Sequence, residues 1–233
     1  MYKTDPEWLQ SKSDELRRKV IEYHEKTKRG HMGPSLSSVE ILTSLYYNIM
    51  DEEDRFLLSK GHASSVLYVV LNDKGKIPDD VLYSLEEHPK INLDYGIYAS
   101  TGSLGHGLSI GSGIAQANPK RNVYVLLGDG ECDEGQIWEA ARDASDYHAK
   151  NLTAIVDCNG FQGLRRTNNT NLDKKFESFG WNSCWGDGHN CKDLILRINS
   201  EHEKPLVILA KTIKGKGMEG LEGTLGSHYY HPK

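Results

Sequence analysis

The central part of the chain, residues 122–160, reads NVYVLLGDGECDEGQIWEAARDASDYHAKNLTAIVDCNG. Two apolar runs rich in β-branched residues, at 122–127 and 152–156, are typical of buried strands. Between them, at 134–148, apolar residues recur at helical spacing. A strand, a helix and a second strand in this order predict a βαβ unit with parallel strands and a right-handed crossover.

The segments on either side continue this alternation. Apolar runs predict further strands at 55–59 and 206–210. Helices are expected at 7–28, 38–50 and 191–200, around 66–70, and after the glycine-rich turn at 101–107. Residues 72–100 are rich in loops. The sequence therefore predicts an α/β fold in one domain, 1–233, with an open, mostly parallel sheet and helices on both faces.

The composition excludes several classes of protein. The 233 residues carry 28 Lys and Arg against 33 Asp and Glu, a formal net charge of −5, which argues against a nucleic-acid binder. No stretch approaches the roughly 18 apolar residues of a membrane-spanning helix. Residues 1–19 lack the apolar segment of a signal peptide, and the four cysteines form no CxxC pair or zinc-type cluster. Reduced thiols and a cytoplasmic location, without a membrane or nucleic-acid partner, are therefore expected.

Polar residues follow both strands of the central unit. Asp129 stands between Gly128 and Gly130 after the first strand, and Asn159 follows the second strand thirty residues later. Ligands of open parallel sheets bind beyond the carboxyl ends of the strands, and adjacent strands lie about 4.8 Å apart. Carboxylate and amide oxygens suit Mg²⁺, and a helix beginning near Cys132 would offer free N–H groups to an anion. Gly-Asp-Gly alone is ordinary turn chemistry, but this spacing predicts a site for a diphosphate and Mg²⁺.

Five segments resemble motifs of one enzyme family, in the order that the family has them. They read GHMGPSLSSVE (30–40), LSKGHA (58–63), TGSLGHG (101–107), GDGECDEGQIWEAA (128–141) and IVDCNGFQG (155–163). The sequence thus resembles the transketolases, and in particular the N-terminal section of transketolases split over two genes. The resemblance spans nearly the whole chain and implies the thiamine diphosphate-binding fold, with this chain as its diphosphate-binding domain.

The resemblance also implies site residues. Asp129, Asn159 and the backbone carbonyl of Phe161 would bind Mg²⁺, which Ca²⁺ or Mn²⁺ could replace. Thiamine diphosphate (thiamine pyrophosphate) would be bound by residues of four motifs: His62, Gly102, Ser103, Leu104, Gly128, Gly130, Glu131 and Asn159. Glu134 and Glu139 match acidic residues at a subunit interface.

Histidines of this family line the channel of cofactor and substrate, and the resemblance assigns catalytic roles to His31, His62, His88 and His228. Neutral imidazoles suit general acid–base work on sugar hydroxyls. The alternative to a catalytic role is a structural one for each of these histidines, because a histidine beside glycine is commonly a turn or capping residue. His228 is the weakest match, because it stands near the end of the chain, where free tails are mobile.

Two features depart from the family pattern. His106 replaces the usual Gln of the TGxLGQG segment, which could alter a contact to the cofactor or the substrate. The segment GLRRTNNT, at 163–170, is unusually polar where relatives close the metal loop. Its Arg165 and Arg166 either contact a partner or a substrate phosphate, or are ordinary exposed loop arginines.

The implied function is carbohydrate metabolism: transfer of a two-carbon ketol unit from a ketose to an aldose, phosphorylated or not, through thiamine diphosphate. The glutamate that activates this cofactor belongs to a pyrimidine-binding domain, which we expect on a partner chain, the C-terminal section, in a two-plus-two heterotetramer. Two alternatives remain: a related enzyme that transfers an acyl unit from pyruvate, and a non-catalytic homologue that binds the cofactor or a partner.

Overall fold

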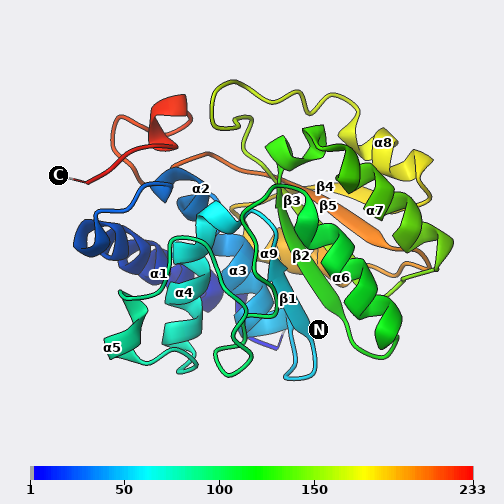
Figure 1. Cartoon of the computed structure of the whole chain (residues 1–233), viewed down its shortest axis with the longest axis horizontal. Coiled ribbons are helices and arrows are strands. Elements are labelled where there is room, and N and C mark those ends of the chain that lie inside the picture. The colour runs from blue at the N-terminus through cyan, green and yellow to red at the C-terminus, as the bar shows by residue number, and fades with distance from the viewer. Residues whose placement is uncertain (1–2, 233) are drawn as a thin grey trace.

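The sheet at the centre of the chain consists of five parallel strands in the order β1-β2-β3-β5-β4 (Figure 1). The computed structural model describes residues 3–232. The strands are β1 Arg55–Leu58, β2 Val123–Gly128, β3 Leu152–Cys158, β4 Asn182–Asp187 and β5 Leu206–Lys211. The open parallel sheet that the sequence predicts is therefore confirmed, but β4, at its edge, was not among the predicted strands.

Helices cover both faces of this sheet, as Figure 1 shows. Strand residues alternate between two hydrophobic cores: Phe56, Tyr124 and Leu126 belong to one, and Val123 and Val125 to the other. Residues of the inner strands are buried on both sides, which explains their unbroken apolar runs. The first core is covered by α1 Pro6–Thr27, α3 Val39–Ser44, α4 Ser64–Asp73 and α9 Cys191–Ile198, and the second by α6 His106–Ala117, α7 Gly135–Asp146 and α8 Leu172–Ser178.

Small residues let α6 approach the sheet closely. A Cβ added at Gly111 would lie 2.4 Å from Cγ2 of Val125 on β2, so only glycine fits there. This contact sets how closely α6 packs on the sheet, and the glycine-rich turn at 101–107 leads into α6. The remaining short elements are α2 Met32–Leu36, η1 Leu45–Ile49, η2 Gly61–Ala63, α5 Asp79–Leu82, η3 Asp129–Asp133 and η4 Leu225–Ser227.

Helix boundaries differ from the predictions at two places. The helix predicted at 38–50 is α3 followed directly by a π-helical turn, η1. The segment after β2 forms a 3₁₀ turn, η3, where a helix start near Cys132 was expected; α7 itself begins at Gly135, within one residue of the start predicted at 134. None of the described helices is both long and apolar enough to cross a membrane.

Candidate functional site

A cavity of about 230 Å³ lies beyond the carboxyl ends of β2 and β3. Twelve of the thirteen residues predicted for the site line it; Ser103 lies in a shallower hollow next to it. The lining residues are His31, Pro34, Lys60, His62, His88, Gly102, Leu104, Gly128, Asp129, Gly130, Glu131, Asn159, Phe161, Gln162, Gly163, Lys214, His228 and Tyr229. Segments from the whole length of the chain therefore converge where the sequence predicts a site.

Asp129 is buried directly after β2 and is held by the loop that follows β3. Its Oδ2 accepts hydrogen bonds from the Gly160 N–H (2.8 Å), the Thr167 hydroxyl (2.7 Å) and the Asn169 amide (2.8 Å). Burial raises the pKa of this carboxyl, and the bonds from Asn169 and Thr167 oppose that rise. Thr167 and Asn169 come from the polar segment that the sequence analysis set apart, so this segment positions Asp129.

Asn159 lies one residue beyond the end of β3, as Asp129 lies one residue beyond the end of β2. The two residues share one edge of the sheet, because Gly128 of β2 is paired with Asp157 of β3. Its amide nitrogen donates to Asp157 Oδ2 (3.0 Å), and its Oδ1 accepts from the Phe161 N–H (3.1 Å). These two bonds fix the amide orientation and identify Oδ1 as the oxygen available to a cation.

A buried ion pair that was not predicted from the sequence supports this edge of the sheet. Lys60 forms a short salt bridge with Asp157 and also donates to the Pro34 carbonyl (2.9 Å) and the Ser38 hydroxyl (3.1 Å). Burial alone raises the pKa of Asp157, but the charge and hydrogen bond of Lys60 outweigh it and lower the pKa. Asp157 therefore stays ionised under the cavity floor and holds Asn159 in place.

Lys214 is a second buried lysine that the sequence analysis missed. Its ammonium donates to the backbone carbonyls of Phe161 (3.1 Å) and Gln162 (3.4 Å). Burial and the charge of Lys60 lower its pKa to about 8. The ammonium thus already occupies the Phe161 carbonyl, the oxygen predicted to bind the metal.

The oxygens of Asp129, Asn159 and Phe161 fit a hard divalent cation, because carboxylate, amide and carbonyl oxygens are its preferred ligands. Among residues 3–232 no group of three or more His, Cys, Asp or Glu could hold a metal ion. A cation here would therefore depend on these three oxygens and on oxygens of a ligand, which is typical of Mg²⁺ bound with a diphosphate.

Glu131 joins the loops around the cavity through its side chain. Its Oε1 accepts from the Ser59 hydroxyl and the Gly105 N–H, both at 2.7 Å, and its Oε2 accepts from the Gly128 N–H at 2.9 Å. Burial raises the pKa of this carboxyl against the effect of these donors. The resemblance implies that Glu131 binds the cofactor, and the structure adds a role for its carboxylate in holding three motifs together.

Four histidines form one cluster above the strand ends. The ring of His31 lies 5.1 Å from that of His228, 5.6 Å from that of His62 and 6.2 Å from that of His88, measured between ring centroids. Burial and the charge of Lys60 lower the pKa of His62 well below its ordinary value, and burial and Lys214 lower that of His228 to about 3. His62 and His228 are therefore neutral rings.

His228 differs from the expectation of a mobile tail. The segment that carries it, which Figure 1 draws in red beside α2, packs against the body of the chain through η4 and α2. The His228 ring is buried, and its Nδ1 has no hydrogen-bond partner among the described residues. An orphaned buried polar atom on a cavity wall is the kind of group that a ligand satisfies.

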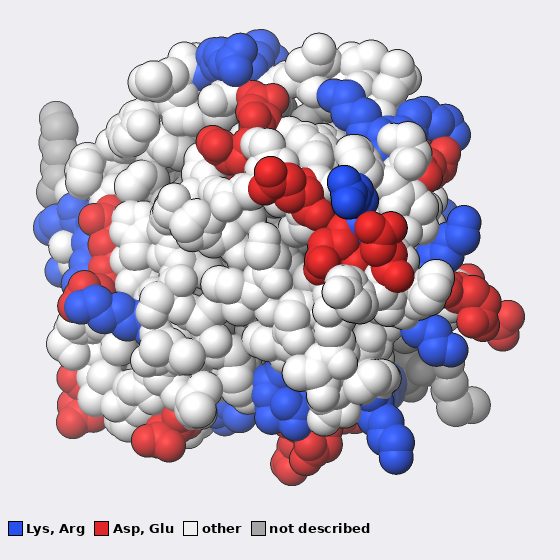
Figure 2. Space-filling view, turned by 45° about the vertical axis from the view of Figure 1, so that its right-hand side comes forward, with Lys and Arg blue, Asp and Glu red and all other residues white. Residues whose placement is uncertain are grey.

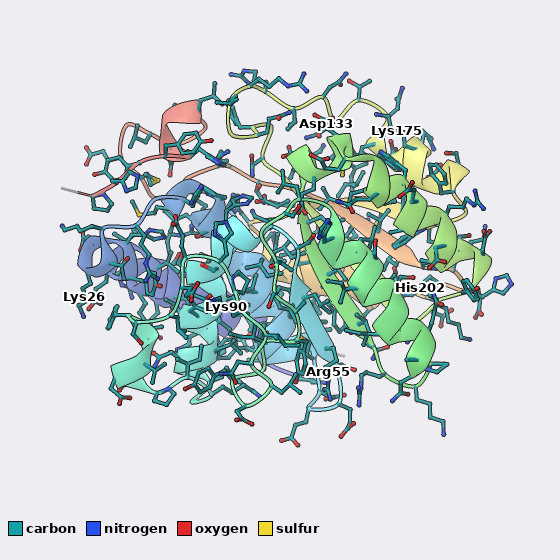
Figure 3. The ribbon with its side chains drawn as sticks, viewed as in Figure 1. Lys26, Arg55, Lys90, Asp133, Lys175 and His202 are labelled. Carbon is teal, nitrogen blue, oxygen red and sulfur yellow. The ribbon has the colours of Figure 1, made fainter. Side chains whose placement is uncertain are left out.

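The other residues singled out in the sequence lie at the rim or on the surface. His106, at the start of α6, is exposed, as are Glu134 and Glu139 beside or on α7. Arg165 pairs with Asp133 (3.2 Å), which Figure 3 labels at the upper edge of the molecule. Arg166 lies over the Phe161 ring, 4.6 Å from its centroid. Both arginines are exposed, which is compatible with either of the two interpretations.

Comparison with known proteins identifies the family. The family described as "Transketolase, thiamine diphosphate binding domain" matches residues 10–230. The chain belongs to this family. The predicted resemblance, the fold and the class of a transketolase-type transferase are thereby confirmed.

Similar proteins of this family differ in how much of their own length this chain covers. An apulose-4-phosphate transketolase subunit of Phocaeicola vulgatus is 36% identical over 97% of this chain and 90% of its own length. A 6-deoxy-6-sulfo-D-fructose transketolase subunit of Clostridium sp. (strain MSTE9) is 37% identical over 94% of this chain and 90% of its own length. The crystal structure of transketolase from Campylobacter jejuni superimposes with a TM-score of 0.87 at 28% identity, and the match covers 97% of this chain but only 40% of that one.

Proposed function

We propose that this chain is the thiamine diphosphate-binding subunit of a two-subunit transketolase, which transfers a two-carbon ketol unit from a ketose to an aldose in the cytoplasm. The arrangement that supports this most directly is the meeting of Asp129, Asn159 and a cluster of histidines at one cavity. The lengths of the relatives also support the two-subunit proposal. The chain covers 90% of each of the two transketolase subunits but only 40% of the transketolase from Campylobacter jejuni.

In this proposal the cation and the diphosphate lie at the strand ends. Asp129, Asn159 Oδ1 and the Phe161 carbonyl would hold Mg²⁺, or Ca²⁺ or Mn²⁺ in its place. The ammonium of Lys214 would pair with a negative diphosphate oxygen, because it is buried and its hydrogen-bond partners within residues 3–232 are two backbone carbonyls. Thiamine diphosphate, when bound, supplies the chemistry of ketol transfer, and the protein positions it.

The histidine cluster would contact the sugar hydroxyls. Neutral His62 and His228 can each accept one hydrogen bond and donate another, so they can orient hydroxyl groups without adding charge. The unpartnered Nδ1 of His228 supports this role, since a hydroxyl or water of the bound state would satisfy it. Neutral rings also serve as proton acceptors when a hydroxyl proton must leave.

A partner chain would complete the site. The outward positions of α6 are uncharged: His106, Ser109, Ile110, Gly113 and Ala117. The side that carries α6 and α7 comes forward in Figure 2, where a broad area without Lys, Arg, Asp or Glu is visible among scattered charges. We assign this side, with Glu134 and Glu139 at its margin, to the interface with a pyrimidine-binding C-terminal-section subunit in a two-plus-two heterotetramer.

The cation site is tested by titration calorimetry of thiamine diphosphate with Mg²⁺ into the complex of both subunits. Asp129→Ala should weaken binding by about tenfold or more, because the carboxylate is the only charged protein ligand proposed. Asp80→Ala removes an exposed carboxylate of α5, outside the side assigned to the partner, and should bind like the wild type. Equal affinity in Asp129→Ala and the wild type would exclude the metal assignment.

The assembly is tested by activity. The purified chain with thiamine diphosphate, Mg²⁺, a ketose phosphate and an aldose phosphate should show no turnover until the partner subunit is added. Robust turnover by the chain alone would refute the two-subunit proposal. Pyruvate as the only effective donor would instead favour the acyl-transfer alternative.

A further inference from the structure

The carboxylate of Glu87 reaches the centre of the histidine cluster from outside the motifs. Its Oε1 lies 2.9 Å from Nδ1 of His31. The backbone on which it stands is anchored to α4: the Glu87 carbonyl accepts a short hydrogen bond from the Ser64 hydroxyl, and the Glu86 carbonyl accepts one from the Tyr68 hydroxyl (3.1 Å). The fold therefore sets the position of the Glu87 backbone, while its side chain is 45% exposed and is held by the contact with His31.

His31 is equally well fixed. It has a left-handed backbone with φ 64°, and its N–H donates to the His228 carbonyl at 3.1 Å. A non-glycine residue keeps this conformation only where its surroundings hold it, and such residues cluster at functional sites. Its side chain is only 20% exposed and is surrounded by the rings of His62, His88 and His228. The His31 ring is therefore held in place, and the more exposed Glu87 carboxylate reaches it from an anchored backbone.

The contact decides which ring nitrogen of His31 carries hydrogen. An ionised carboxylate can only accept, so Nδ1 must be the N–H. In a neutral ring the other nitrogen, Nε2, is then an acceptor. We infer that Glu87 is a positioning residue that holds His31 in the Nδ1–H form, so that Nε2 takes the proton of a sugar hydroxyl in the cavity.

The identity of that hydroxyl rests on the proposed function; the tautomer does not. When the proton moves, the hydroxyl O–H bond breaks and an Nε2–H bond forms, and the electron pair of the broken bond stays on the sugar oxygen. The resulting imidazolium faces the negative charge of Glu87, which stabilises it as carboxylates do in other carboxylate–histidine pairs. The proton returns from Nε2 to the product, so the pair is unchanged after one turnover.

The tautomer can be measured on the chain itself. In long-range ¹H–¹⁵N spectra of histidine-labelled protein at mildly alkaline pH, with His31 assigned through His31→Gln, the wild type should show the Nδ1–H form. Glu87→Ala should shift His31 towards the Nε2–H form, and Glu87→Gln, whose amide oxygen can still accept, should keep the Nδ1–H form. Glu86→Ala is the matched control: it removes the neighbouring acidic side chain, whose salt-bridge partner is Lys90 (labelled in Figure 3), and should leave the tautomer unchanged.

Kinetics of the complex with the partner subunit give the second measurement. Glu87→Ala should lower kcat by about ten- to a hundredfold, part of what a general base contributes, with KM changed by less than about twofold, and Glu87→Gln should recover part of the loss. An Nε2–H form in the wild type, an unchanged tautomer in Glu87→Ala, or wild-type kcat in Glu87→Ala would overturn the inference. If the wild-type complex transferred no ketol unit while the tautomer still depended on Glu87, the proposed function would fail and the assignment of the tautomer would stand.

Discussion

Lys214 carries a buried positive charge whose partners are neutral carbonyl groups. Burying a charge is costly, and the charges of Asp157 and Asp129 offset this cost only in part, because the pKa of Lys214 is still lowered. The charge therefore serves binding rather than stability. Lys214→Met should leave the thermal stability of the ligand-free chain nearly unchanged, because it removes this cost along with the two hydrogen bonds. The same variant should bind Mg²⁺ with inorganic pyrophosphate about tenfold or more weakly in calorimetry. Lys211→Met, at an exposed lysine on the end of β5, is the control; equal affinities of the two variants would show that Lys214 does not bind the diphosphate.

The ion pair of Lys60 and Asp157 shows why part of the site could not be predicted. Asp129 and Asn159 follow two strands of one βαβ unit, so their meeting follows from that order, and the resemblance to a family implied the other metal and cofactor residues. Lys60 and Asp157 are 97 residues apart, and no spacing rule connects them. The one available signal was Asp157 itself, an acidic residue inside an otherwise apolar strand, since a buried carboxylate requires a partner.

At the scale of elements, strands were predictable where both of their faces are covered. The runs at 122–127, 152–156 and 206–210 correspond to β2, β3 and β5, whose residues are almost all buried. Strand β4 reads NSCWGD and is mostly half-exposed at the edge of the sheet. It has neither an apolar run nor a regular alternation, so its pairing with β5, and not its own sequence, makes it a strand.

The Glu131 carboxylate links three segments of the chain, at Ser59, Gly105 and Gly128, and its loss should destabilise the contacts among them. In Glu131→Gln the amide nitrogen would replace an acceptor that faces N–H and hydroxyl donors, so at least one buried donor loses its partner. We expect the free energy of unfolding to fall by about 2–3 kcal/mol, measured by urea denaturation. Glu53→Gln, at a side chain that is 84% exposed, should change it by less than about 0.5 kcal/mol. A loss in Glu131→Gln as small as in this control would mean that the carboxylate does not hold the loops.

At the scale of the whole molecule, Glu40 joins the first helix to the C-terminal part of the chain. This fully buried carboxylate pairs with Arg17 of α1 (2.5 Å), with His189 before α9 (3.0 Å) and with Lys216 beyond β5 (2.9 Å). Burial alone raises the pKa of Glu40, but the hydrogen bond from His189 and the charge of Arg17 outweigh it and lower the pKa to about 2. The ionised form is therefore part of the folded state.

Acid should remove the stabilisation that ionised Glu40 gives to the folded chain. Because the pKa of Glu40 is lower in the folded chain than its ordinary 4.5, the stabilisation, worth about 3 kcal/mol, is complete above pH 4.5 and is lost as the pH falls towards 2. Glu40→Gln should be about 3–5 kcal/mol less stable at neutral pH, since Arg17 keeps a buried charge without its partner. Its unfolding free energy should depend less on pH in this range than that of the wild type, whereas Glu201→Gln, at an exposed glutamate, should follow the wild type. Denaturant unfolding between pH 2 and 7 compares the three proteins, and parallel curves for Glu40→Gln and the wild type would rule out Glu40 as the titrating group.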